Sequence, residues 1–230
     1  VTGPDGESRR GKIWGELVPY GLSDNGFGTA KKMPWRAGAN ENTVITFSHD
    51  VKVEGREIGA GSYGFHTIPG IDEWVLIFSK NATSWGSYYY NEQEDALRVS
   101  VKPGKNEYTE WLTFDFIERM SDYTVCALKW DETIVPFKIE ADANEIYLGM
   151  IRNELRNSPG FTWQSWVQAA NFCVNNKINL EEALTWADNA INLSFVGEKN
   201  FTTLQTKASV LSALGRGSEA EAIMEEAINH

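Results

Sequence analysis

The densest polar segment of the chain is residues 34–43, directly before an expected strand. The planar guanidinium of Arg36 could hold a carboxylate or phosphate, and Asn40 and Glu41 could orient a ligand hydroxyl. In the alternative interpretation these residues form an internal network, in which Arg36 pairs with Glu41 and Asn40 caps a turn. The sequence leaves both interpretations open.

Aromatic residues form a second candidate site. Residues 85–91 include one tryptophan and three tyrosines, among them Trp85 and Tyr88, and Trp35 lies next to Arg36. Sugar rings stack on flat apolar faces, and tyrosine hydroxyls supply hydrogen bonds. These residues therefore suggest a carbohydrate platform, although sandwich cores also use Trp and Tyr for packing.

Residues 59–64 satisfy the spacing G-x-G-x-x-G. A dinucleotide site needs a helix directly after this motif, but residues 65–69 have the pattern of a strand. The chain also lacks the lysine strand and the His-Arg-Asp loop that accompany a kinase glycine loop. We therefore expect these glycines to serve a β turn or bulge, and Ser62 is not placed as a nucleophile.

Histidines and cysteines give no catalytic or metal constellation. The three histidines include no closely spaced pair, so no zinc site, metal or cofactor is predicted. His66 could act as an acid or base, or could be a hydrogen-bonded structural residue. Cys126 and Cys173 lie in apolar segments and are expected to pack in separate cores.

The first part of the chain has the pattern of strands, with short apolar or alternating runs separated by Gly, Asn, Asp and Pro. Expected strands are residues 43–48, 51–53 and 56–58 in a tight hairpin, 74–78, and 97–101. Later alternating positions are Leu112, Phe114 and Phe116, then Cys126, Leu128 and Trp130, then Val135, Phe137 and Ile139. We predict an antiparallel β-sandwich or barrel over residues 1–140.

From residue 141 the apolar period changes from two to about 3.6, which indicates helices. The first helical stripe ends at Pro159 and Gly160, and further helices are expected near residues 163–175, 180–191, 201–214 and 218–228. Ala183 and Ala220 occupy matching small positions, at an offset near the roughly 34-residue tetratricopeptide period. The predicted fold class is therefore α+β, with an all-α, tetratricopeptide-like domain over residues 141–230.

Residues 74–78 are apolar on both faces of their strand, so the face away from the sheet core needs a cover. The helical half is the candidate cover, and we predict that the two halves dock. The helical half could offer a concave partner-binding surface, or could only cap and stabilise the β domain.

The overall charge excludes some partners. Asp and Glu number 32 and Lys and Arg 21, which gives a net charge of -11. This charge disfavours nucleic acid and anionic membrane surfaces as partners. No apolar run approaches the roughly 18 residues that a membrane-spanning helix needs.

Several separated motifs resemble one family, the domain of unknown function 2911. They are residues 10–15 (RGKIWG), 17–21 (LVPYG), 35–41 (WRAGANE), 60–64 (AGSYG), 68–69 (IP) and 97–99 (LRV). The family comprises mostly exported bacterial proteins with no established reaction, so the resemblance implies a periplasmic or otherwise exported β domain. Residues 22–33 are longer than the link expected in the motif, and the chain begins without a signal segment, so we expect export to apply to a precursor.

The leading functional hypothesis is a non-catalytic envelope protein that binds a glycan or a partner protein. Its expected ligand-binding residues are Trp35, Arg36, Asn40, Glu41, His66, Trp85 and Tyr88. One alternative is a hydrolase or isomerase of unrecognised type, with Glu41 and His66 as the acid and base. Another is an interaction scaffold that acts through the helical domain.

Overall fold

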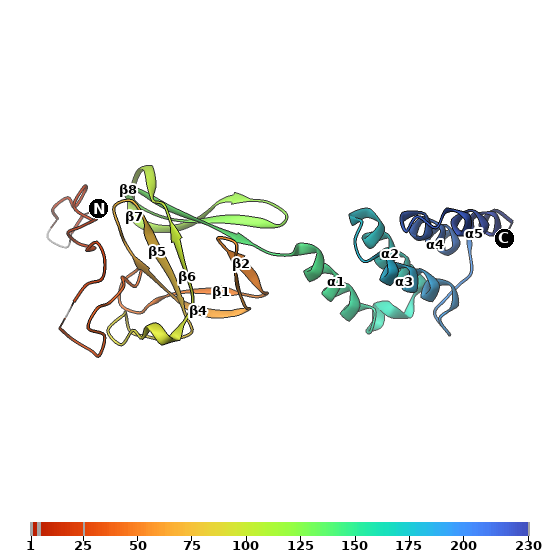
Figure 1. Cartoon of the computed structure of the whole chain (residues 1–230), viewed down its shortest axis with the longest axis horizontal. Helices are drawn as coiled ribbons and strands as arrows, with labels where there is room; N and C mark the ends of the chain where they lie inside the picture. The colour runs from red at the N-terminus through yellow and green to blue at the C-terminus, as the bar shows by residue number, and fades with distance from the viewer. Residues whose placement is uncertain (1, 4–5, 25, 230) are drawn as a thin grey trace. The chain divides into compact units, whose positions relative to one another are not determined.

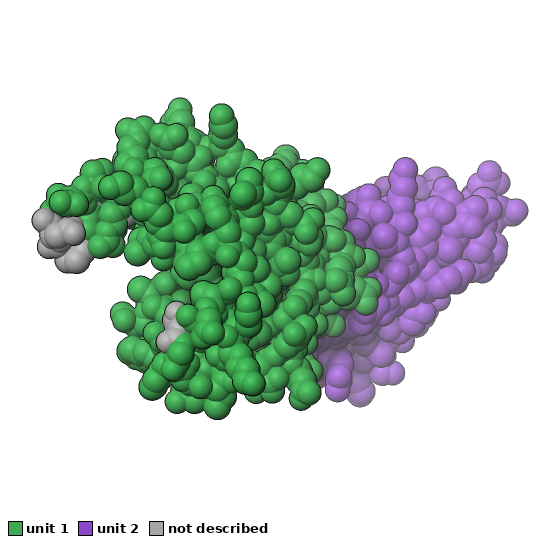
Figure 2. Space-filling model, turned by 60° about the vertical axis from the view of Figure 1, so that its left-hand side comes forward, with its two compact units in different colours: residues 1–142 green, residues 143–230 purple. Residues whose placement is uncertain are grey.

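The computed structural model describes residues 2–3, 6–24 and 26–229 of the chain. It has two compact units, residues 1–142 and 143–230, which Figure 2 shows in different colours. Among the described residues, every strand lies in the first unit and every α-helix in the second (Figure 1). This is the predicted α+β fold class.

The first sheet is antiparallel and has the strand order β1-β4-β5-β6. Its strands are β1 (Thr43–Phe47), β4 (Gly61–Ile68), β5 (Trp74–Ser79) and β6 (Asp95–Val101). The short 3-10 helix η1 (Glu92–Glu94) leads into β6, and Asn91 caps it by accepting a hydrogen bond from the Gln93 N–H. β1, β5 and β6 lie close to where alternation and apolar content predict them.

The second sheet is also antiparallel and has the order β3-β2-β8-β7. Its strands are β2 (Val51–Val53), β3 (Arg56–Ile58), β7 (Gly104–Arg119) and β8 (Tyr123–Glu140). The turn between β2 and β3 falls at Glu54 and Gly55, both at positive φ, as the predicted tight hairpin requires.

β8 joins two stretches that the sequence analysis treats as separate groups of alternating positions. Even-numbered residues face the core up to Leu128, whereas Val135 and Phe137 are the buried positions later in the strand. Asp131 lies between the two stretches, at a φ of 53°, and the pairing with β7 shifts register around it. An irregularity of this kind reverses which residues face the core, so a single long strand carries both patterns.

The two sheets pack face to face around one apolar core. The rings of Phe65 in β4 and Phe137 in β8 stack with centroids 5.7 Å apart. Other buried members from both sheets include Val53, Trp74, Phe78, Leu97, Val99, Leu128, Val135 and Ile139. The first unit is therefore a β-sandwich, the first of the two architectures that the sequence leaves open.

The outer face of β5 is covered within the β unit. Ile77 is fully buried on this face, in register with His66 of β4 and Arg98 of β6. Ser87 and Tyr90, from the segment between β5 and β6, contact His66. The apolar strand therefore does not need the helices as its cover, and docking of the two halves stays a prediction.

The second unit contains the predicted helices, almost at the predicted bounds. They are α1 (Ala143–Glu154), α2 (Trp163–Asn176), α3 (Leu180–Asn192), α4 (Phe201–Ala213) and α5 (Gly217–Asn229), with the 3-10 helix η2 (Ser158–Phe161) after α1. α2 packs against α3 and α4 against α5, and the small residues Ala183 and Ala220 are buried. Two such hairpins in succession are tetratricopeptide-like. No helix in the described part of the chain is long and apolar enough to cross a membrane.

The glycine motif lies on a strand, as expected, and not at the start of a helix. Gly61 and Gly64 belong to β4, and Gly61 has a φ of 152°. A side chain at Gly64 would collide with the backbone oxygen of Asn81 and the side-chain amide of Asn42. Gly64 is therefore required because the segment after β5 crosses β4 at close range.

We expect Gly64→Ala to lower the free energy of unfolding by about 1–3 kcal/mol, since the added methyl group must displace backbone. Gly59→Ala is the matched control from the same motif, because its methyl group would meet its nearest atom at an ordinary 3.6 Å. Chemical denaturation of both variants measures the difference. Equal losses in the two variants would show that the crossing does not depend on Gly64.

Candidate functional site

A cleft of about 630 Å³ opens in the β unit. Its lining comes from the segment before β1, the segment between β5 and β6, and strands β7 and β8. The lining residues that matter for its chemistry are Trp35, Arg36, Ser87, Tyr88, Trp111 and Trp130. The cleft therefore combines flat aromatic surfaces with one guanidinium.

Trp35 and Trp130 form one wall of the cleft, and Trp14 and Trp74 extend this aromatic cluster into the core. Trp35 and Trp130 stack with centroids 6.1 Å apart, at an interplanar angle of 15°. Trp14 meets both of them edge-on, at 5.7 and 5.8 Å, and also meets Trp74 at 5.0 Å. Trp35 is held in place through its backbone, which exchanges two hydrogen bonds of 2.7 Å with Thr67. The backbone of Trp35 is therefore tied to β4.

Arg36 lines the cleft without a charged partner. Its side chain forms no hydrogen bond or ion pair with another described residue, and its Nε is buried without a hydrogen-bond partner. The pairing with Glu41 that the internal-network interpretation requires does not form. By contrast, Arg98 donates to the Asp95 carboxylate at 2.6 Å. The Nε–H donor of Arg36 thus finds no acceptor among the described residues.

The guanidinium of Arg36 lies against the backbone of residues 85–91, the aromatic segment. A methyl group at Gly86 would lie 3.1 Å from Nη1 of Arg36 and 3.2 Å from Cε2 of Tyr88. Gly86 also has a φ of 65°. The missing side chain of this glycine leaves room for both Arg36 and Tyr88, so both can line the cleft.

Asn42 anchors the aromatic segment to the start of β1. It is buried, its backbone N–H donates to the carbonyl of Ser84 at 3.1 Å, and its Nδ2 donates to the carbonyl of Asn81 at 3.4 Å. The two ends of the segment are joined by a hydrogen bond of 2.8 Å from the backbone N–H of Lys80 to the carbonyl of Glu94. These bonds fix the loop that carries Ser87 and Tyr88.

His66 supports the cleft from behind. Its Nδ1 lies 2.9 Å from the Oγ of Ser87, which lines the cleft, and its ring is 2% exposed. Burial lowers the pKa of His66 to about 4, so the imidazole is neutral at pH 7. Tyr90 packs against this ring and donates a hydrogen bond of 2.6 Å to Asp95. Burial, followed by that hydrogen bond, raises the pKa of Tyr90 above its ordinary value.

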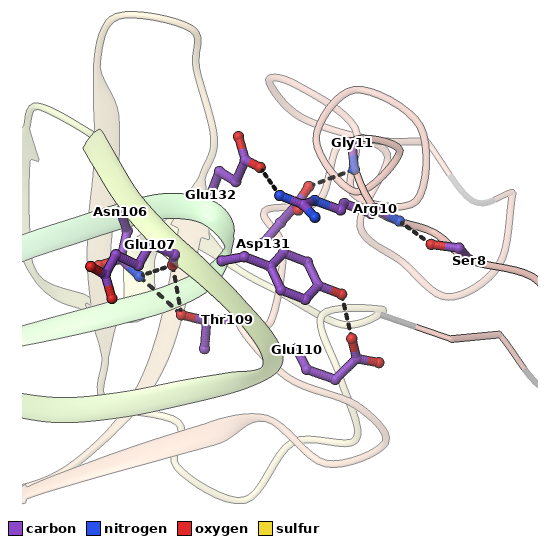
Figure 3. Close-up of polar contacts among 10 residues, drawn as sticks. Ser8, Arg10, Gly11, Asn106, Glu107, Thr109, Glu110, Asp131 and Glu132 are labelled. Carbon is purple, nitrogen blue, oxygen red and sulfur yellow. Dashed lines mark hydrogen bonds and ion pairs between the residues drawn. The ribbon is translucent and has the colours of Figure 1, made fainter.

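A polar network at the edge of the cleft ties the N-terminal segment to β7 and β8 (Figure 3). Arg10 donates to Glu132 at 2.6 Å, and the N–H of Gly11 donates to Asp131 at 2.8 Å. Glu110, which also lines the cleft, accepts hydrogen bonds from the hydroxyl of Tyr108 and, at 3.4 Å, from that of Thr2. This carboxylate is therefore engaged by groups other than Arg36.

Three of the predicted site residues, Trp35, Arg36 and Tyr88, line the cleft together. Asn40 and Glu41 are exposed and outside the lining, and Trp85 is 59% exposed next to Gly86. His66 is buried behind Ser87. The structure thus does not bring Glu41 and His66 together as an acid–base pair.

One comparison with known proteins identifies a family. The chain matches the family described as "Protein of unknown function (DUF2911)" over residues 4–139. The chain belongs to this family. Neither the curated proteins nor the solved structures give a match.

The DUF2911 match spans the β-sandwich, so the cleft is a feature of the DUF2911 domain. Helices α1 to α5 follow the matched residues as an extension. The described residues of both units include no cluster of His, Cys, Asp or Glu that could hold a metal ion. Cys126 and Cys173 are buried and free, as predicted, and burial raises the pKa of each thiol to about 11.

Four residues that shape the site are not among those predicted from the sequence: Asn42, Ser87, Trp111 and Trp130. Asn42 follows Glu41 directly, at the boundary of the predicted strand. Alternation places it on the outer face of β1, where the segment after β5 buries its side chain. Ser87 lies within the aromatic stretch that the sequence does single out. Trp111 and Trp130 reach the cleft through the long β7–β8 pairing, for which no local pattern exists.

Proposed function

We propose that the DUF2911 domain of this chain is a non-catalytic binding module that holds a glycan in the cleft. The observation that carries the proposal is an unpartnered guanidinium, Arg36, beside the stacked rings of Trp35 and Trp130. A volume of about 630 Å³ falls in the range of small-ligand sites, which combine apolar walls with a few polar groups. A sugar presents both kinds of surface.

The position of Trp111 favours a glycan as the ligand over a protein partner. It lines the cleft and is 79% exposed, so one face of its ring is available for stacking. Together with Trp35 and Trp130, which line the same cleft, it favours a flat ligand that enters a cleft. A protein partner would instead use a broad surface.

The acid–base chemistry supports a binding role. An imidazole with a pKa of about 4 is a weak base at neutral pH, where a general base works best with a pKa near the operating pH. Glu41 lies outside the cleft, so it does not supply the missing carboxylate. The proposal therefore assigns His66 to positioning Ser87.

Family membership extends the proposal to location. The proteins that this domain resembles are mostly exported, so we place the binding module in the bacterial cell envelope. Fractionating cells that produce the natural full-length protein tests this placement, and recovery in the cytoplasmic fraction alone would contradict it.

We expect Trp111→Ala to weaken glycan binding about 10-fold, since it removes one stacking face of the cleft. A thermal-shift screen of the full chain against oligosaccharides identifies a ligand, and isothermal titration then gives the dissociation constants. A ligand at 100 times its dissociation constant should stabilise the domain by about 2.7 kcal/mol.

Trp85→Ala is the matched control, because Trp85 is also exposed but does not line the cleft. We expect this variant to bind the glycan almost as the wild type does. If Trp85→Ala abolished binding while Trp111→Ala left it unchanged, the ligand would lie on the aromatic segment and not in the cleft.

A further inference from the structure

We propose that the ligand of the cleft carries a carboxylate, so that the DUF2911 domain binds an acidic sugar with Arg36 as the anchor for its charge. This inference rests on the proposed function and adds the chemical class of the ligand. It follows from the position of Arg36, from the groups around it and from the number of charges in the cleft.

Arg36 is a charged group prepared for a partner that the chain does not supply. Its Nε is buried and has no hydrogen-bond partner, and Arg36 lines the cleft. A buried charged donor is costly without an acceptor. A ligand carboxylate would satisfy the guanidinium with two parallel hydrogen bonds, the geometry that arginine provides best.

The carboxylate that already lines the cleft does not fill this role. Glu110 accepts hydrogen bonds from the hydroxyls of Tyr108 and Thr2, and forms no ion pair with Arg36. Of the other eight arginines, four have carboxylate partners, namely Arg10, Arg98, Arg152 and Arg216. The described residues give no ion pair to the other four, Arg9, Arg56, Arg119 and Arg156. Arg36 is the one of these unpaired arginines that lines the cleft, where a ligand carboxylate would supply its counter-charge.

The positive charge of Arg36 stands out because the chain as a whole is negatively charged. The net charge is -11, so acidic ligands are repelled by the protein as a whole and can be held only at a site built for them. Among the described lining residues, Arg36 is the one cation. One guanidinium matches the single charge of a carboxylate, whereas phosphate sites gather two or more cationic or N–H donors.

The aromatic walls identify the rest of the ligand as a sugar ring. Trp35, Trp130 and Trp111 offer flat apolar faces within the cleft that holds Arg36. The hydroxyls of Ser87 and Tyr88 and the carboxylate of Glu110 lie in the same lining and can bond to sugar hydroxyls. A ring that carries hydroxyls and one carboxylate uses all of these groups.

The test compares two oligosaccharides that differ only at the carboxyl group: an oligosaccharide of glucuronic acid and N-acetylglucosamine, and the form in which that group is reduced to a hydroxymethyl group. Isothermal titration of the full chain should give about 10- to 100-fold tighter binding of the acidic form, the range expected for charge-assisted hydrogen bonds. Arg36→Gln should bind both forms equally. Arg36→Lys should recover part of the preference, because it restores the charge without the planar fork.

Arg119→Gln removes the same charge from an exposed position outside the cleft and should keep the full preference. Thermal unfolding of each variant checks that its fold is intact. If the reduced form bound the wild type as tightly as the acidic form, the carboxylate inference would be wrong, but glycan binding would stand. If neither form bound, while a peptide with a free C-terminal carboxylate did, the proposed glycan function would fail as well.

Discussion

Acidification from pH 7 to about pH 4 should remove about 3 kcal/mol from the free energy of unfolding of the β-sandwich through His66 alone. The pKa of this imidazole is about 4 in the folded chain, against 6.5 for an ordinary histidine, because burial disfavours its charged form. Between these two values the unfolded chain binds a proton that the folded chain does not. The contribution is therefore complete above about pH 6.5 and is lost as the pH falls towards 4.

Urea-induced unfolding of the full chain at several pH values measures this loss. His66→Gln cannot titrate and keeps a polar group beside Ser87, so its stability should fall with pH by about 3 kcal/mol less than that of the wild type. His49→Gln is the control, since His49 is exposed, and should keep the wild-type dependence. If His66→Gln lost stability as steeply as the wild type, burial of His66 would not govern the acid response.

Replacing Trp74 by Ala should destabilise the β-sandwich by about 3–5 kcal/mol, which is the cost of deleting a large aromatic side chain from a packed core. Trp74 is 1% exposed and makes edge contacts with Trp14 at 5.0 Å and with Trp35 at 6.3 Å. Its loss leaves a cavity behind the tryptophan wall. We expect the melting temperature to fall by about 10 °C or more.

Trp85→Ala is the comparison from the same domain and should change stability by less than about 0.5 kcal/mol, since its side chain is mostly in solvent. Differential scanning calorimetry of the two variants measures the contrast. Similar melting temperatures for both would mean that the tryptophan cluster does not support the core.

The helical unit is predictable from sequence because its signals are local. The spacing of apolar residues, the stop at Pro159 and Gly160, and the small residues Ala183 and Ala220 act within one or two turns of helix. The predicted and observed helix bounds accordingly agree to within a few residues. The strands are also found by alternation, but the sequence does not give their order in the two sheets.

The pattern of buried positions in β8 suggests two strands, but it also marks the irregularity of a single strand. The buried positions change from even to odd along the strand, which suggests two strands. The change instead marks the irregularity at Asp131, whose positive φ and shifted pairing carry one strand through both patterns. A change of phase without a turn signal between the two runs therefore predicts a bulge.

The candidate site is predictable only in part. Residue type points to Trp35, Arg36 and Tyr88, because a guanidinium can hold a carboxylate or phosphate and aromatic rings can stack on sugars. Trp111 and Trp130 join them through pairing between distant segments, and their contribution appears only once the strands are placed. His66 and Asn42 hold the loop in place from beneath.

Binding of an acidic sugar in the cleft can be tested by nuclear magnetic resonance. The signals of the tryptophan indole N–H groups are followed during titration with an acidic oligosaccharide. The chain has tryptophans in the cleft, at 35, 111 and 130, and in the helical unit, at 163, 166 and 186. We predict that the three cleft signals shift together and saturate, while the three helical signals stay in place. Shifts confined to the helical tryptophans would contradict the account and assign ligand binding to the other unit.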